Sequence, residues 1–189
     1  ENTLIGGFAG DALTTGAENL AIGYNSLSKE TSGGKNVALG AYTLQDQNKT
    51  TDAFNVAVGY RAGLLVNTGT QNTLIGGLAG DALTTGSFNV ALGYSSLSTT
   101  NIGAKNVAIG NFALNENVRT NSNVAVGQQA LQSLVGDGST DNQETYNTAV
   151  GYFAGKEITS ATRNTVIGGL AGDAMTSGGD NVAIGASAL

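Results

Sequence analysis

Asn-Val-Ala-Ile-Gly-Asn-Phe-Ala-Leu, residues 106–114, is the clearest copy of a short unit that recurs along the whole chain. The unit is Asn, then Val or Thr (once Leu), then usually Ala, then Ile, Leu or Val, then Gly. Eleven copies begin at Asn2, Asn19, Asn36, Asn55, Asn72, Asn89, Asn106, Asn123, Asn147, Asn164 and Asn181. Eight of the ten spacings are 17 residues, and the others are 19 and 24. This periodicity predicts a repeat protein in which each unit packs on its neighbours.

The unit favours β-strands over helices. Asn-Val-Ala-Ile-Gly alternates every two residues, contains β-branched side chains and is ended by Gly each time. Two Gly-containing turns within 17 residues leave no room for a helix of about ten residues or more. Gly adopts turn conformations that a Cβ forbids, and Asn can bond its own backbone ahead of a strand. We therefore expect two short strands per unit, each followed by a tight turn.

Stacked in register, such units predict an all-β fold, a parallel β-solenoid (β-roll) of about eleven 17-residue coils. Equivalent residues would lie about 4.8 Å apart, which gives a rod roughly 50 Å long with ladders of Asn and of Ile, Leu and Val. Residues 1–189 form a single repeat domain, and since they begin and end within the pattern we expect a segment of a longer fibre. The two long spacings predict surface loop insertions near residues 45–52 and 136–144.

The two faces of the strand indicate a partner chain. The fourth residue of the unit is Ile, Leu or Val in every copy, and the third, on the opposite face, is Ala or a larger aliphatic residue. No charged residue occupies the second to fifth places in any copy. A sheet with one face in water alternates apolar with polar residues. One face can be covered within the roll, and we expect the other to be buried in an oligomer; exposure of small Ala residues is the alternative.

Composition excludes several classes of function. The net charge is −6, and the 8 Lys and Arg residues are scattered singly, so phosphate-binding clusters for nucleic acid are lacking. No apolar run approaches the roughly 20 residues of a membrane span. With no His and no Cys, the usual general base, thiol nucleophile and common metal ligands are missing. We expect no enzymatic activity, no catalytic residues, no metal and no cofactor.

Two groups of residues are candidates for ligand contact. Asp137, Asp141 and Glu144 form the one acidic cluster, within Gly-Asp-Gly-Ser-Thr-Asp-Asn-Gln-Glu, and could bind a cation or ligand or be a solvated loop. Tyr60 and Tyr152, like two other tyrosines, directly follow the Gly that ends a strand. They could stack on sugars along the outer edge or pack over the turn.

The units at residues 106–114 and 181–189 resemble the YadA-like head repeats of trimeric autotransporter adhesins. That resemblance implies a left-handed parallel β-roll in which three chains pack around a common axis. The strings NTLIGGLAGDALTTG (residues 72–86) and NVAVGYRAG (residues 55–63) are more similar still to repeats of bacteriophage tail-fibre proteins. The resemblance covers the whole chain, whereas the 17-residue unit is longer than is typical of the bacterial heads.

We therefore predict a homotrimeric shaft or head of an adhesive fibre. The leading hypothesis is a phage tail fibre that presents a receptor-binding tip, placing the chain on the virion. The alternative is the head of a bacterial trimeric autotransporter adhesin on the extracellular cell surface. The receptor would be a cell-surface glycan or protein. A glycan-degrading tailspike is a further alternative, and it would depend on carboxylates such as Asp137 or Asp141.

Overall fold

The computed structural model describes residues 1–138 and 142–189, and within these residues it contains strands and turns but no helix. Eleven strands of the described chain form one large sheet: β1 (Thr3–Ile5), β2 (Leu20–Ile22), β3 (Val37–Leu39), β4 (Val56–Val58), β5 (Thr73–Ile75), β6 (Val90–Leu92), β7 (Val107–Ile109), β9 (Val124–Val126), β11 (Thr148–Val150), β12 (Thr165–Ile167) and β13 (Val182–Ile184). Two shorter strands, β8 (Thr120–Asn121) and β10 (Gln143–Glu144), form a separate parallel pair.

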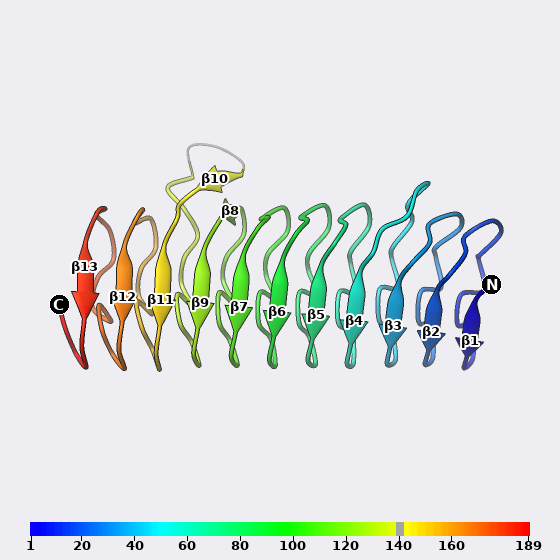
Figure 1. The fold of residues 1–189 in the computed structure, drawn as a ribbon, viewed down its shortest axis with the longest axis horizontal. Helices are drawn as coiled ribbons and strands as arrows, with labels where there is room; N and C mark the ends of the chain where they lie inside the picture. Colours follow the sequence, from blue (N-terminus) through cyan, green and yellow to red (C-terminus); the bar gives the residue numbers. More distant parts are fainter. Residues whose placement is uncertain (139–141) are drawn as a thin grey trace.

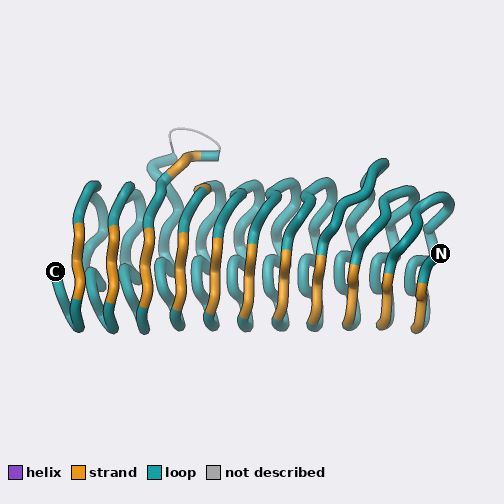
Figure 2. Tube along the Cα trace, in the orientation of Figure 1, coloured by secondary structure: helices purple, strands orange, loops and turns teal. Residues whose placement is uncertain are grey.

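Successive coils stack in one register. Each strand of the large sheet pairs in parallel with the strand of the next coil. Equivalent residues of the repeat face each other, as Ala91 with Ala108 and Leu92 with Ile109. The strands lie along one flank of an elongated roll and point the same way (Figure 1), while turns and loops complete each coil (Figure 2). The expected parallel β-solenoid of about eleven coils is confirmed.

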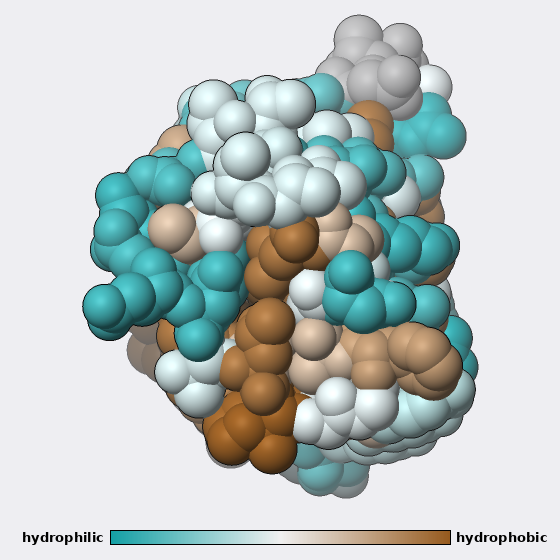
Figure 3. All heavy atoms as spheres, turned by 90° about the vertical axis from the view of Figure 1, so that its right-hand side faces the viewer, coloured by the Kyte–Doolittle hydropathy of each residue, from teal (hydrophilic) through white to brown (hydrophobic). Residues whose placement is uncertain are grey.

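Each strand places its middle residue inside the roll. Counting the repeat from its Asn as position 1, position 3 is buried in every strand of the large sheet except the terminal β1. Positions 2 and 4 lie on the outside, and we call the surface that they form the outer face. Seen from its end, the roll shows a vertical band of hydrophobic atoms across the middle of the end face (Figure 3). The core is therefore a narrow column enclosed by each coil.

The prediction of a second strand in each coil is wrong. The segment that follows the strand-ending Gly has positive φ at positions 7 and 9, such as 50° at Ser95 and 54° at Leu97. A β-strand requires negative φ, so this side of the coil consists of turns. Its amides still bond to a neighbouring coil, as Leu97 N does to Ala113 O at 3.0 Å. A left-handed Leu costs about 1–2 kcal/mol, which its fully buried side chain offsets.

The asparagine column forms a continuous ladder, as expected. From Asn19 to Asn181, each backbone N–H donates to the Oδ1 of the Asn in the preceding coil, at 2.9–3.1 Å. In eight coils the side-chain Nδ2 donates to the carbonyl fourteen residues later, as Asn89 does to Gly103 at 2.9 Å. One side chain thus joins a coil both to itself and to its predecessor.

The two longer coils lack the hydrogen bond from Nδ2 to the carbonyl fourteen residues later, but they keep the ladder. Asn36 and Asn123 begin the coils of 19 and 24 residues, and their Nδ2 atoms donate to the carbonyls of Gly34 and Asn121, two residues earlier. The extra residues project from the same long edge of the roll, opposite the strand-ending glycines (Figure 1). An insertion therefore enlarges the loop at this edge of its own coil and leaves the next strand in its place.

Buried Glu30 compensates for the first insertion. Its Oε1 accepts hydrogen bonds from the backbone N–H groups of residues 31–33 at 2.7–3.1 Å. In an uninterrupted pair of coils the equivalent N–H groups, those of residues 67–69, converge on the carbonyl of Thr84 in the next coil. The longer coil beyond Glu30 presents no such carbonyl to residues 31–33, and the carboxylate takes its place.

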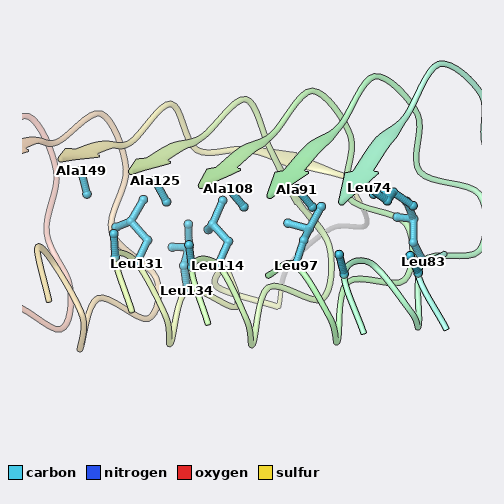
Figure 4. Close-up of a cluster of buried hydrophobic side chains, with 14 of the residues drawn as sticks. Leu74, Leu83, Ala91, Leu97, Ala108, Leu114, Ala125, Leu131, Leu134 and Ala149 are labelled. Carbon is cyan, nitrogen blue, oxygen red and sulfur yellow. The ribbon is translucent and has the colours of Figure 1, made fainter. Parts of the chain in front are cut away.

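The core is filled in two interchangeable ways. Where position 9 is Gly, position 12 carries the apolar side chain: Leu13, Val66, Leu83, Ile158 or Met175. Where position 9 is Leu, position 12 is polar in four of five coils: Glu30, Gln47, Thr100 and Asn117, with Leu134 as the exception. A Cβ on Gly80 would lie 2.9 Å from Cδ2 of Leu74, so in this coil a Leu at position 9 would clash with the Leu at position 3. Figure 4 shows both arrangements side by side, with Leu83 in one coil and Leu97 in the next.

We expect Asn89→Ala to lower the free energy of unfolding by roughly 2–6 kcal/mol, because it leaves two buried groups without partners at about 1–3 kcal/mol each. These are the N–H of Asn106 and the carbonyl of Gly103. Urea denaturation measures the loss. The control is Asn101→Ala, since Asn101 is exposed and water can replace its hydrogen bond. Equal losses in the two variants would contradict the role of the ladder.

Gly80→Leu alone should destabilise the roll by about 2–5 kcal/mol through overpacking and a left-handed Leu. Adding Leu74→Ala and Leu83→Thr reproduces the arrangement of the next coil, with Ala91, Leu97 and Thr100. The triple variant should therefore regain most of the lost stability in the same denaturation experiment. A triple variant no more stable than Gly80→Leu would show that the coils are not interchangeable.

Candidate functional site

Tyr60 and Tyr152 both lie on the edge of the roll just beyond the strand-ending glycines. The positive φ of the preceding Gly, 130° at Gly59, turns the chain away from the sheet and directs position 6 outward. Tyr60 is 56% exposed and Tyr152 is 51% exposed. Both candidates are therefore accessible along this edge, but their neighbours differ.

Tyr60 ends a continuous row of aromatic rings. Phe8, Tyr24, Tyr42 and Tyr60 come from four successive coils and meet edge to face, with centroids 5.8, 5.4 and 6.1 Å apart. We call these four residues the aromatic row. Such edge-to-face pairs contribute about 0.5–1.5 kcal/mol beyond the area that they bury. The rings thus pack on each other over the turns and still leave surface open to solvent.

Tyr152 belongs to a separate pair. Its ring stacks on that of Phe153 in the same coil, with centroids 3.9 Å apart and planes 18° from parallel. Lys156 lies 5.1 Å from the Phe153 centroid and pairs with Glu157 at 3.2 Å. The face of Tyr152 toward Phe153 is therefore already occupied.

A hollow of about 250 Å³ adjoins the end of the aromatic row. It is lined by Tyr42, Gln45, Tyr60, Arg61 and Leu64, which two neighbouring coils contribute. Sequence reasoning identified Tyr60 and missed Gln45 and Arg61. One signal was present, because Arg61 is the only basic residue at position 7 in any copy of the repeat.

Arg61 brings a positive charge to the hollow. Among the described residues its guanidinium makes no hydrogen bond and no ion pair. The side-chain amide of Gln45 likewise has no partner within the described part of the chain. The charge of Arg61 acts on Asp81: burial raises the pKa of the Asp81 carboxyl, and the positive charge opposes that rise. The hollow therefore combines two aromatic rings with an available cation and an available amide.

The structure does not gather the acidic candidates into a site. Asp141 lies outside the described residues. Asp137 is exposed, and its backbone N–H donates to Oε1 of Gln143 at 3.0 Å. Glu144, in β10, accepts from the hydroxyl of Ser122 and pairs with Lys105 at 3.1 Å. In the described portion of the chain, no three acidic, His or Cys side chains form a group that could hold a metal.

Glu144 anchors the longer insertion to the roll. The hydrogen bond from Ser122 holds the pKa of the Glu144 carboxyl below its usual value, with a further contribution from Lys105. The same segment pairs with β8 through Gln143 and Glu144. The carboxylate therefore attaches the end of the 24-residue coil to the two preceding coils.

No family model, curated protein or solved structure matches this chain. In the described residues we find no helix with the length and hydrophobicity needed to cross a membrane.

The lowered pKa predicts how the anchor responds to acid. A group whose pKa is lower in the folded state stabilises that state above its unfolded pKa, and the contribution is lost as the pH falls through the folded value. The pKa of the Glu144 carboxyl should thus lie below 4.5. Carbon-detected NMR of the side chain measures this titration. Ser122→Ala should move the midpoint back toward 4.5. A midpoint unchanged by that substitution would mean that the hydroxyl does not hold the carboxylate.

Proposed function

We propose that this chain is a rigid shaft or head segment of a homotrimeric adhesive fibre, of the kind that phage tail fibres use to hold a receptor-binding tip away from the virion. The observation that carries the proposal is the outer face. It is a partly exposed surface of Val, Ile, Leu and Thr side chains without a charged residue, and a fibre of several chains would bury it.

The outer face runs the whole length of the sheet. Every strand contributes Val, Thr or Leu at position 2 and Ile, Leu or Val at position 4. Away from the ends of the roll these side chains are still partly exposed, for example Leu39 at 41% and Leu92 at 45%. Eleven strands at about 4.8 Å, each roughly 10 Å long, give a strip on the order of 500 Å². This size equals that of the largest apolar patch on a typical monomer, which is often functional.

Much of the stability of the roll comes from contacts away from the outer face. The Asn ladder, the backbone bonds between coils and the buried Ala and Leu column all lie within the chain. A stack stabilised in this way is stiff along its axis because every coil is bonded to the next. The outer face is thus free for assembly, and burying it would also protect the sheet from aggregation.

The number of chains and the biological setting rest on the resemblance to tail-fibre and adhesin-head repeats. Three copies would display the same edge three times around one axis, so weak binding at each edge would add up through avidity. The strings at residues 55–63 and 72–86 favour the tail fibre over the bacterial adhesin head.

Light scattering should give a mass three times that of the 18.9 kDa chain. Ile109→Lys places a charge on the outer face, where it would be buried in the assembly, and should reduce the mass to that of one chain. The matched control is Ala82→Lys at position 11, because Lys29 occupies that position in another coil. A wild-type protein that is a single chain at micromolar concentration would overturn the proposal.

A further inference from the structure

The hollow at the end of the aromatic row has the composition of a small-ligand site. It is lined by the partly buried ring of Tyr42 and the exposed ring of Tyr60, and the side chains of Gln45 and Arg61 make no hydrogen bond or ion pair within the described structure. A guanidinium without a hydrogen bond beside an exposed aromatic ring has unused hydrogen-bonding capacity at a place where an apolar surface is also available.

We propose that this hollow binds one acidic sugar unit of a glycan, with the carboxylate on Arg61 and the C–H face of the sugar on the Tyr42 and Tyr60 rings. Arginine presents paired donors that match the two oxygens of a carboxylate. The amide of Gln45 is placed to bond the ring hydroxyls.

The size of the hollow limits the ligand. Its volume of about 250 Å³ lies below the roughly 300–1,000 Å³ of sites for drug-sized molecules. One sugar unit fits that limit, and the rest of a longer glycan would run along the aromatic row past Tyr24 and Phe8, where it meets further ring surface. The site is open on its solvent side, so we expect weak binding at each chain.

Its place in the repeat explains why the other coils lack such a site. Arg61 follows Tyr60 directly, whereas Tyr24, Tyr94 and Tyr152 are followed by Asn25, Ser95 and Phe153. Gln45 stands at position 10 of the longer 19-residue coil. The combination of rings, cation and amide therefore occurs once among the described coils.

Ligand-observed NMR with methyl glucuronoside and methyl glucoside tests the inference on the chain in its native assembly. The glucuronoside should bind with a dissociation constant in the millimolar range, and the neutral glucoside at least about tenfold more weakly, as expected for a charged hydrogen bond. Arg61→Gln should remove this preference. Tyr60→Ala should weaken both ligands, and Ala41 at the same position of the preceding coil shows that the roll accepts Ala there.

The matched control is Tyr152→Ala, which removes an equally exposed tyrosine from a coil without the hollow and should leave binding unchanged. Light scattering of each variant separates loss of the site from loss of the assembly. Equal binding of the two glycosides, equal effects of Tyr60→Ala and Tyr152→Ala, or tighter binding of a short Asp- and Glu-containing peptide than of the glucuronoside would each overturn the inference.

Discussion

The amide of one asparagine per coil is the constraint on which the whole roll depends. It accepts from the next coil through Oδ1, and in eight coils it donates across its own coil through Nδ2. Buried amide groups that lose partners cost about 1–3 kcal/mol each, so a shift of register by one residue would be penalised at every coil. The ladder thus fixes where each strand begins, and the strand fixes which side chains enter the core. Register, pitch and burial are consequences of one repeated contact.

Most of the architecture could be predicted because the repeat occurs eleven times and its asparagines mark which residues of neighbouring coils align. The parallel sheet, the Asn ladder and the absence of helices all follow from spacing and from residues such as Asn106 and Ile109. The second strand could not be predicted correctly, since Leu at position 9 has no sequence mark of a left-handed conformation. The aromatic candidates were foreseen at Tyr60, but the hollow was not. It requires Gln45 and Arg61 to meet across two coils, and the 19-residue spacing obscures which residues align.

Stability and surface are largely separate in this molecule. Most buried polar groups of each coil find hydrogen-bond partners within the chain. This holds even where an insertion interrupts the pattern, because Glu30 supplies the missing acceptor. The outer face and the edge of aromatic rings contribute little to that interior. Residues there can change to suit a neighbouring chain or a ligand, provided that the buried Ala, Leu and Asn columns remain. This separation accounts for Tyr, Gly, Ala, Asn and Gln all occurring at position 6.

Both insertions leave the roll at one edge and return before the next asparagine, as at Asn55 and Asn147. Two kinds of genetic event therefore change the roll in different directions, one along its axis and one across it. Duplicating whole repeats extends reach, whereas adding codons between positions 13 and 17 widens a single level and leaves every other level where it was. Selection could therefore change the surface loop of one coil while the length of the roll stays constant.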